Sequence, residues 1–283
     1  MPKPWILVSP ANRGIGHALT RHLLRTTTAP VLATARSNLP GVRESILDSL
    51  HSSEGNGEEV ESASKRLHML YVDVTDESTL ATASAEAAEL FPPKTHHLHL
   101  AFALPGVLHP EKSPRDIDYA AALHTLQVNV LGPLMLMKHF SEFLPRRNTE
   151  ISDRPLFSAS KTEERGPGPS HATWLTASAR VGSTSDNRLG GWYTYRASKA
   201  AVNSVTRSFD QHLRTRSGDA AVAIAYHPGT VRTDLSKDYW DRVREDRLFS
   251  PEYAAERMLE VVRSRGVEHR GRCWDWKGEE ILP

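Results

Sequence analysis

Short apolar runs rich in β-branched residues alternate along the chain with longer amphipathic stretches. The apolar runs have the length of buried strands and cover residues 5–9, 30–35, 67–72, 98–104, 172–178 and 220–227. The amphipathic stretches predict helices over residues 14–26, 76–91, 116–144, 192–214 and 251–264. This alternation predicts an α/β fold, a doubly wound parallel sheet of about seven strands flanked by helices.

Two polar segments interrupt the alternation. Residues 51–66 are acidic and contain glycine, and residues 153–171 are rich in proline and glycine. Both are predicted as surface loops inserted between regular elements. Because no linker divides the sequence, we expect a single domain over residues 1–283.

Composition narrows the range of partners. The chain has 35 basic and 34 acidic side chains, a formal charge of +1, which supplies no field for holding a nucleic acid. A small-molecule partner is expected instead. Cys273 is the single cysteine, so an internal disulfide is excluded and a reducing, cytoplasmic location is expected. No apolar run approaches the length of a membrane span, so no membrane partner is expected.

A glycine pair lies between the first predicted strand and the first predicted helix, in SPANRGIGHALT. A turn with Gly14 and Gly16 lets backbone N–H groups approach a pyrophosphate at the positive end of the helix. A tight turn without a ligand explains the same glycines. After the second strand, Arg36 stands where many dinucleotide sites carry an acid, and with Arg13 it could clasp a ribose phosphate, which favours NADP(H) over NAD(H). The alternative is that both are exposed surface arginines.

The stretch GGWYTYRASKAAVN contains candidates for acid–base chemistry. Tyr195 and Lys199 are one helical turn apart and share a face, whereas Tyr193 is six positions from the lysine. A nearby ammonium is expected to lower the pKa of the phenol towards neutrality. Ser178 ends a predicted strand, where the sites of parallel sheets collect, and could hold a substrate carbonyl. An ordinary surface pair of tyrosine and lysine is the alternative.

Taken together, these motifs resemble the short-chain dehydrogenase/reductase family, most closely its carbonyl-reductase and C-factor-like members. The Tyr-x-x-x-Lys pair is YRASK, the glycine motif is SPANRGIG, and the Pro-Gly segment that lines the nicotinamide is HPGTVRTDLS. The match runs in order from Trp5 to about Trp276. The resemblance implies a one-domain Rossmann fold, hydride transfer between a nicotinamide and a carbonyl or alcohol, and pairing into a homodimer or homotetramer through two long central helices.

The resemblance assigns a role to each motif residue. The catalytic set is Asn129, Ser178, Tyr195 and Lys199, with Tyr195 giving its proton to the developing alkoxide and with Lys199 and Asn129 refilling it through ribose and water. With the arginines argued above, the expected cofactor set is Ser9, Asn12, Arg13, Gly14, Ile15, Gly16, Arg36, Asp73, Val74, Ala103, Tyr195, Lys199, Pro228, Gly229, Val231 and Thr233.

Three departures from the family pattern stand out. Pro10 replaces a glycine and lacks an N–H, Ala103 replaces an asparagine, and seventeen positions separate Ser178 from Tyr195, a few more than is usual. They favour a rival function, a non-catalytic NADP(H)-binding sensor. A binder, however, has no need of the Tyr, Lys and Ser set.

Other patterns leave alternatives open. Residues 234–250 are predicted to form a substrate lid with apolar surface from Tyr239, Trp240 and Phe249, or else an ordinary surface helix. Asp76 is expected to cap the helix that follows, while Asp73 could accept from an adenine amino group. His97 and His99 share a strand face, for which a core role is favoured over metal binding, and no metal is expected.

Overall fold

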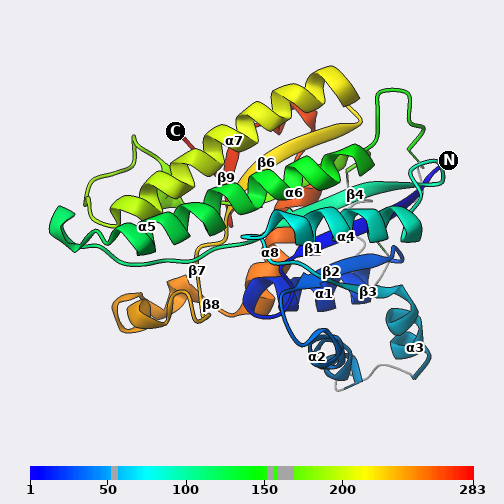
Figure 1. The fold of residues 1–283 in the computed structure, drawn as a ribbon, viewed down its shortest axis with the longest axis horizontal. Coiled ribbons are helices and arrows are strands. Elements are labelled where there is room, and N and C mark those ends of the chain that lie inside the picture. Colours follow the sequence, from blue (N-terminus) through cyan, green and yellow to red (C-terminus); the bar gives the residue numbers. More distant parts are fainter. Residues whose placement is uncertain (52–56, 152–155, 158–168) are drawn as a thin grey trace.

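The computed structural model describes residues 1–51, 57–151, 156–157 and 169–283, built around an eight-stranded sheet (Figure 1). The strand order is β10-β9-β6-β5-β4-β1-β2-β3, and every neighbouring pair is parallel except β9 and β10. The strands are β1 Lys3–Ser9, β2 Val31–Ala35, β3 Leu67–Tyr71, β4 His96–Ala103, β5 Ala172–Ala177, β6 Ala221–His227, β9 Cys273–Asp275 and β10 Glu280–Ile281. The predicted doubly wound fold is confirmed.

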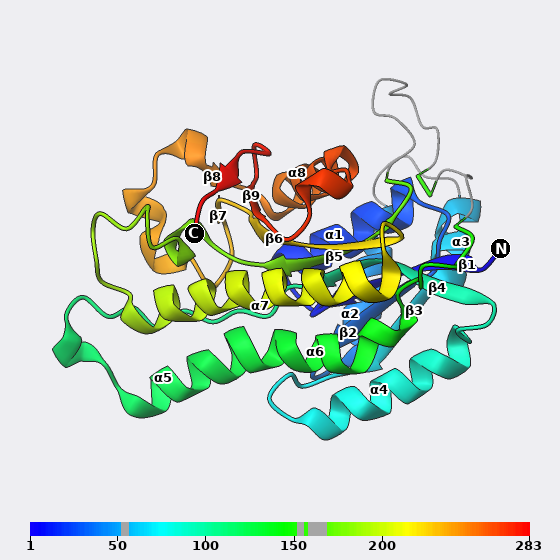
Figure 2. The same ribbon diagram turned by 90° about the horizontal axis from the view of Figure 1, so that it is seen from above.

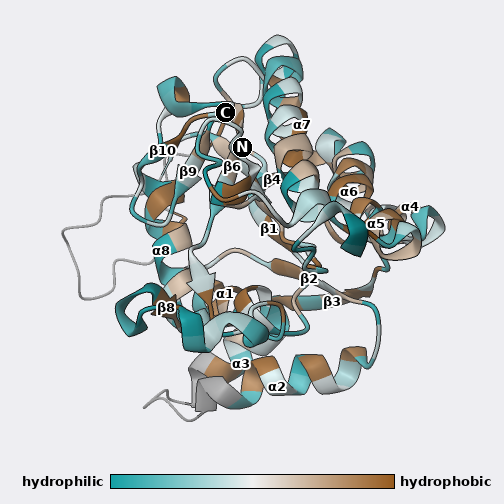
Figure 3. Cartoon of the chain, turned by 90° about the vertical axis from the view of Figure 1, so that its left-hand side faces the viewer, coloured by the Kyte–Doolittle hydropathy of each residue, from teal (hydrophilic) through white to brown (hydrophobic). Residues whose placement is uncertain are grey.

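Helices cover both faces of the sheet (Figure 2). One face carries α1 and α8, which contact each other, and the other carries α4, α6 and α7. The α-helices are α1 Gly14–Thr26, α2 Leu39–His51, α3 Gly57–Arg66, α4 Glu77–Leu90, α5 Tyr119–Leu126, α6 Gly132–Phe140, α7 Tyr193–Ser217 and α8 Pro251–Ser264. Apolar strands lie between these layers (Figure 3), and the order of the strands reverses between β1 and β4, the usual place for a ligand crevice in such sheets.

The predicted polar loops are only partly correct. Residues 57–66 form helix α3 rather than a loop, and α2 precedes it in a stretch for which no helix was predicted. Residues 52–56, 153–155 and 158–168 lie outside the described residues. Within the second segment Phe157 is buried and forms an isolated bridge with Thr27.

The central helical run is more apolar than the sequence analysis allowed. Among the described residues, Tyr119–Phe143 is long and apolar enough to cross a membrane by length and composition, so the expectation that no such run exists is wrong. The same properties suit a helix packed in a protein core, and α6 within this run contacts α4 while α5 contacts α7. Leu123, Leu126 and Leu131 remain exposed on it.

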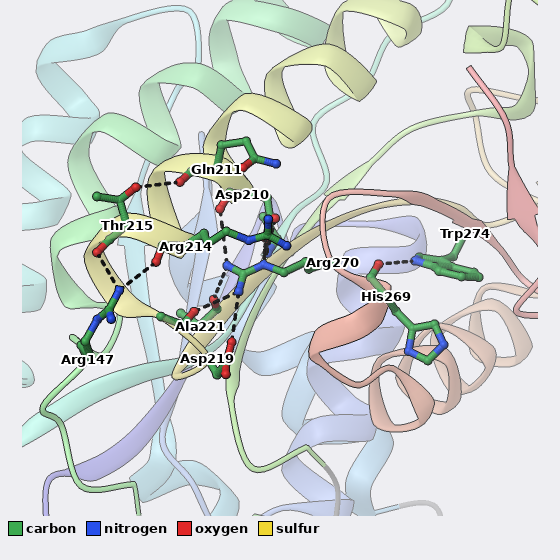
Figure 4. Close-up of polar contacts among 12 residues, drawn as sticks. Arg147, Asp210, Gln211, Arg214, Thr215, Asp219, Ala221, His269, Arg270 and Trp274 are labelled. Atoms are coloured by element: carbon green, nitrogen blue, oxygen red, sulfur yellow. Dashed lines mark hydrogen bonds and ion pairs between the residues drawn. The ribbon is translucent and has the colours of Figure 1, made fainter.

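A buried ion pair connects α7 to the segment before β9 (Figure 4). Arg270 donates from Nε to both carboxylate oxygens of Asp210, at 3.0 and 2.9 Å, and from Nη2 to the carbonyl of Ala221 at 3.2 Å. Asp210 also accepts from the backbone N–H of Ala223 in β6. Because both charges are buried and their hydrogen bonds are made, removing one partner is expected to cost about 3–5 kcal/mol.

Three buried histidines gather near the amino ends of β4 and β5. His97 and His99 lie on the same face of β4 with ring nitrogens 3.2 Å apart, as the core interpretation predicted, and His171 precedes β5. Burial lowers the pKa of His97 and His171 to about 4 and that of His99 to about 3. The folded chain therefore holds all three histidines neutral at pH values where the unfolded chain protonates them.

This cluster predicts acid sensitivity of the fold. Because the unfolded chain binds protons below the ordinary pKa of 6.5, the free energy of unfolding is expected to decrease as pH falls from 6.5 towards 4. The loss is about 2 kcal/mol per buried histidine at pH 5. Chemical denaturation at a series of pH values measures it. His99→Gln should flatten the slope, while the matched change at the exposed His212 should not; a slope unaffected by His99→Gln would contradict the assignment.

Candidate active site

A cavity of about 780 Å³ opens at the carboxyl ends of the central strands. Its wall contains Ile15 from the turn before α1, Ser178 after β5, and Tyr195 and Lys199 from α7. The segment after β6 completes it with Pro228, Gly229, Thr230, Val231, Thr233, Leu235 and Ser236. Residues that are far apart in the sequence therefore line the same cavity.

Tyr195 and Lys199 lie on consecutive turns of α7 and point into this cavity. Both are buried, and the Nζ atom of Lys199 is 5.7 Å from the centroid of the Tyr195 ring. Lys199 donates from Nζ to the carbonyl of Ala177 at 2.9 Å, which fixes its side chain at the end of β5. The shared helix face predicted from the spacing is confirmed.

The expected electrostatic effect on the phenol is wrong for the protein alone. Burial raises the pKa of Tyr195 to about 12 and lowers the pKa of Lys199 to about 8. Loss of water disfavours phenolate and ammonium alike, and this effect exceeds the attraction between the two groups. The phenol is therefore fully protonated at neutral pH and can donate a proton.

Ser178 is buried beside the same two residues. Its hydroxyl donates to Oδ1 of Asn203 at 2.6 Å, and its backbone N–H donates to the carbonyl of Tyr226 at 2.8 Å. The sequence analysis did not select Asn203. Its spacing carried a usable signal, because it stands four positions after Lys199 and eight after Tyr195, on the same face of α7.

Asn129 is fully buried in a π-helical turn, Gln127–Leu131, between α5 and α6. Its Oδ1 accepts from the N–H of Val107 at 2.8 Å, and its Nδ2 donates to the carbonyl of Val107 and to the hydroxyl of Ser198. These bonds attach the segment after β4 to both central helices. The side chain thus has protein partners in the structure, none of which is Lys199.

Glu111 is a further buried acid that the sequence analysis missed. Its carboxylate accepts from the backbone N–H of Thr194 at 2.9 Å and from the Thr194 hydroxyl, while its carbonyl accepts from the N–H of Trp192. It therefore holds the first turn of α7 directly before Tyr195. No local pattern marks Glu111, because its partners lie more than eighty positions away.

The glycine turn before α1 has the predicted geometry. Gly14 adopts φ +55°, and a Cβ on Gly16 would overlap the carbonyl oxygen of Pro10. Ser9 does not contribute its side chain to the turn, because its hydroxyl is buried and accepts from Thr34 at 2.8 Å. Asn12, half-buried, lies in the same turn.

Arg13 and Arg36 are the two cations predicted to bind a ribose phosphate. Arg13 is paired with Asp234 at 2.9 Å, and both side chains are largely exposed. Arg36 is exposed at the end of β2 and near enough to Asp73 to lower the pKa of that carboxyl, although the main cause is a hydrogen bond from Thr75.

Val74 and Asp76 follow strand β3 and Ala103 ends strand β4, at the same edge of the sheet as the glycine turn. Asp76 accepts from Ser78 N–H at 3.0 Å and caps α4, as predicted. Val74 lies against Gly132, and Ala103 is buried at the end of β4. Neither lines the cavity, whose wall here begins at Leu104.

The predicted lid is only partly correct. Residues 237–242 form a 3-10 helix beside the short pair of β7 Thr230–Val231 and β8 Leu248–Phe249 (Figure 1). Tyr239 lines the cavity, but Trp240 does not and instead donates to the Ser236 hydroxyl at 2.9 Å. Phe249 is buried against Trp276, with ring centroids 4.5 Å apart.

No family model matches the chain, but comparison with known proteins finds related sequences and structures of the same fold. The 1-hydroxy-2-glutathionyl-2-methyl-3-butene dehydrogenase of Rhodococcus sp. (strain AD45) is 30% identical over 201 residues, covering 71% of this chain and 74% of the relative. C-signal of Myxococcus xanthus is 32% identical over 166 residues, covering 59% and 81%. The NADPH-bound carbonyl reductase from chicken fatty liver has the same fold, with a TM-score of 0.75 and 23% identity over 100% of both chains. The chain belongs to the short-chain dehydrogenase/reductase family.

Proposed function

We propose that the protein is an NADP(H)-dependent oxidoreductase that reduces a carbonyl compound or oxidises the corresponding alcohol. The observation that carries this proposal is the convergence of Ser178, Tyr195 and Lys199 on one cavity. One of the relatives named above is a dehydrogenase and the similar chicken structure is a carbonyl reductase, which does not favour the non-catalytic alternative. NADPH is bound in the similar carbonyl reductase from chicken, in agreement with the cofactor proposed here.

The residues present fit a dinucleotide. Gly14 and Gly16 bring backbone N–H groups to the positive end of α1, where a pyrophosphate is stabilised. Arg13 and Arg36 provide positive charge, and the end of β2 carries no acid that would bind a ribose hydroxyl. Pro228, Gly229, Val231 and Thr233 would line the nicotinamide, which when bound supplies or accepts the hydride.

The side chains divide the proton chemistry among them. Ser178 would orient the substrate carbonyl through its oxygen, with Asn203 holding the hydroxyl. Tyr195, protonated in its buried position, would donate its phenolic proton to that oxygen as negative charge develops. Lys199 would stabilise the phenolate that remains. Asn129 would keep the segment after β4 in place against α7.

Removal of the phenolic hydroxyl tests the proposed acid. Tyr195→Phe is expected to lower kcat by about 10²- to 10⁴-fold, the usual contribution of a general acid. The Kd for NADPH, measured by nicotinamide fluorescence, should be unchanged. Tyr193→Phe is the matched control, because Tyr193 is 39% exposed and does not line the cavity. Full turnover in Tyr195→Phe would rule out the role given to Tyr195.

The lysine should set the alkaline limit of activity. Since burial lowers the pKa of Lys199 to about 8, the free protein loses this positive charge as pH rises through that value. We expect kcat/KM, which reports groups of the free enzyme, to fall above about pH 8. Lys199→Arg, which keeps its charge, should move the decline to higher pH. An unaltered profile in Lys199→Arg would show that another group titrates.

The Arg13–Asp234 pair should oppose binding of the phosphorylated cofactor. Asp234 neutralises a cation that the ribose phosphate would otherwise meet. Asp234→Asn is therefore expected to tighten NADPH binding by about 2- to 5-fold, since exposed pairs contribute up to about 1 kcal/mol. The Kd for NADH should change less. Asp241→Asn on the same exposed segment is the control. Weaker NADPH binding in Asp234→Asn would indicate that Asp234 assists the cofactor.

A further inference from the structure

We propose that the substrate is an anionic carbonyl compound, with an apolar body and a carboxylate that Arg188 and Arg242 bind at the mouth of the cavity. This inference rests on the proposed function and specifies its substrate class. Among the residues that the structure describes, five cationic side chains and one carboxylate line the cavity, namely Arg180, Arg188, Arg196, Lys199, Arg242 and Asp186. The wall is therefore strongly cationic in a chain whose formal charge is only +1.

Three of these cations already have partners within the protein. Arg180 lies between Asp186 and Asp275, at 3.3 and 2.8 Å. Arg196 donates to the carbonyls of Gly190 and Gly191 at 3.2 and 3.0 Å, and Lys199 donates to a carbonyl at the end of β5. Asp186, the only carboxylate that the described residues contribute to the wall, is thus engaged by Arg180, and it does not offset the other arginines.

Arg188 and Arg242 are in a different situation. Both are exposed, and neither side chain makes a hydrogen bond or an ion pair with any residue in the described part of the chain. Arg188 belongs to the turn between β5 and α7, whereas Arg242 ends the 3-10 helix of the lid segment. Figures 1 and 2 show these two segments at the same end of the molecule, beside β7 and the start of α7. An anion that enters the cavity between them would meet both guanidinium groups.

The remainder of the wall selects an apolar body. Leu104, Pro105, Leu108, Trp192, Leu235 and Val243 contribute to it. His227 also lines the cavity, but burial lowers its pKa to about 4, so it is neutral at pH 7. Apart from Lys199, positive charge near the substrate therefore comes from arginines, whose planar guanidinium groups suit a carboxylate. Arg13 and Arg36, which we assign to the cofactor, do not line this cavity.

Substrate pairs that differ only in charge test the inference. Aldehydes bearing a carboxylate, in a series of increasing chain length and in an aromatic form such as 4-carboxybenzaldehyde, are compared with their methyl esters. At low ionic strength the protein should prefer at least one acid over its ester by about 10-fold or more in kcat/KM, in accordance with a hydrogen-bonded charge pair. The preference should decrease as salt is added, because exposed charges are screened.

Variants separate recognition of the carboxylate from the chemistry. The double variant Arg188→Gln/Arg242→Gln should lose the preference for the acid through a higher KM while its kcat/KM for the ester is retained. Arg188→Glu should reverse the preference. Arg214→Gln, at an exposed position near the far end of α7, is the matched control and should behave as the unaltered protein.

The possible results distinguish failure of this inference from failure of the proposed function. Turnover of the uncharged aldehydes with no acid preference, or an acid preference that survives in the double variant, would overturn the inference and leave the proposed function intact. Binding of NADPH without its oxidation by any carbonyl compound would overturn the proposed function and the inference with it.

Discussion

The start of helix α7 is held by a buried carboxylate from a different part of the chain, and the position of the reacting groups depends on this contact. The first N–H groups of a helix have no partner within it. Trp192, at the cap position with φ +49°, offers no side-chain bond, so Glu111 accepts from Thr194 instead. Its negative charge lies at the positive end of a 25-residue helix. Tyr195 follows Thr194 directly, so Glu111 orients the turn that carries the phenol.

Asn129 makes a second connection between the segment after β4 and helix α7. It joins the backbone of Val107 to Ser198, the residue before Lys199. The segment after β4 is therefore attached to α7 at two places, one before Tyr195 and one between Tyr195 and Lys199. A π-helical turn at Asn129 directs the amide towards both partners, in agreement with the frequent occurrence of such turns at functional sites.

Burial gives the phenol and the ammonium complementary properties. Removal from water raises the pKa of Tyr195 to about 12 and lowers that of Lys199 to about 8, so the two values move apart. A proton donor must hold its proton until the substrate oxygen becomes basic, and a buried phenol does so. The ammonium one turn away then favours the phenolate after transfer. The spacing predicted the pair correctly, but the sequence could not show that burial would outweigh their attraction.

The other elements were predicted or missed according to whether their signal is local in the sequence. The six long strands and helices such as α1 and α8 were predicted well, because period and capping residues such as Ser250, which caps α8, are local. The short strands β9 and β10 were missed, since three- and two-residue strands have no period; β9 exists through pairing with β6, and β10 through pairing with β9. Helix α3 has acidic and polar residues typical of a loop. Glu111 was missed because its partners are remote in sequence.

The departure at Pro10 shows which glycines this family turn requires. A side chain at position 16 would overlap the Pro10 carbonyl, so Gly16 is required by the backbone of the turn itself. Gly14 has φ +55°, and a Cβ there would lie 3.0 Å from the Cγ2 atom of Thr233, so the segment after β6 packs against the turn before α1. Position 10 requires neither a positive φ nor the absence of a side chain. Ala11 continues from it with an N–H bond to the carbonyl of Thr34 at 2.8 Å, which ties the turn to β2. The two glycines that bring backbone N–H groups towards a pyrophosphate are therefore retained for two different reasons, a positive φ at Gly14 and steric overlap at Gly16, and proline is tolerated at position 10.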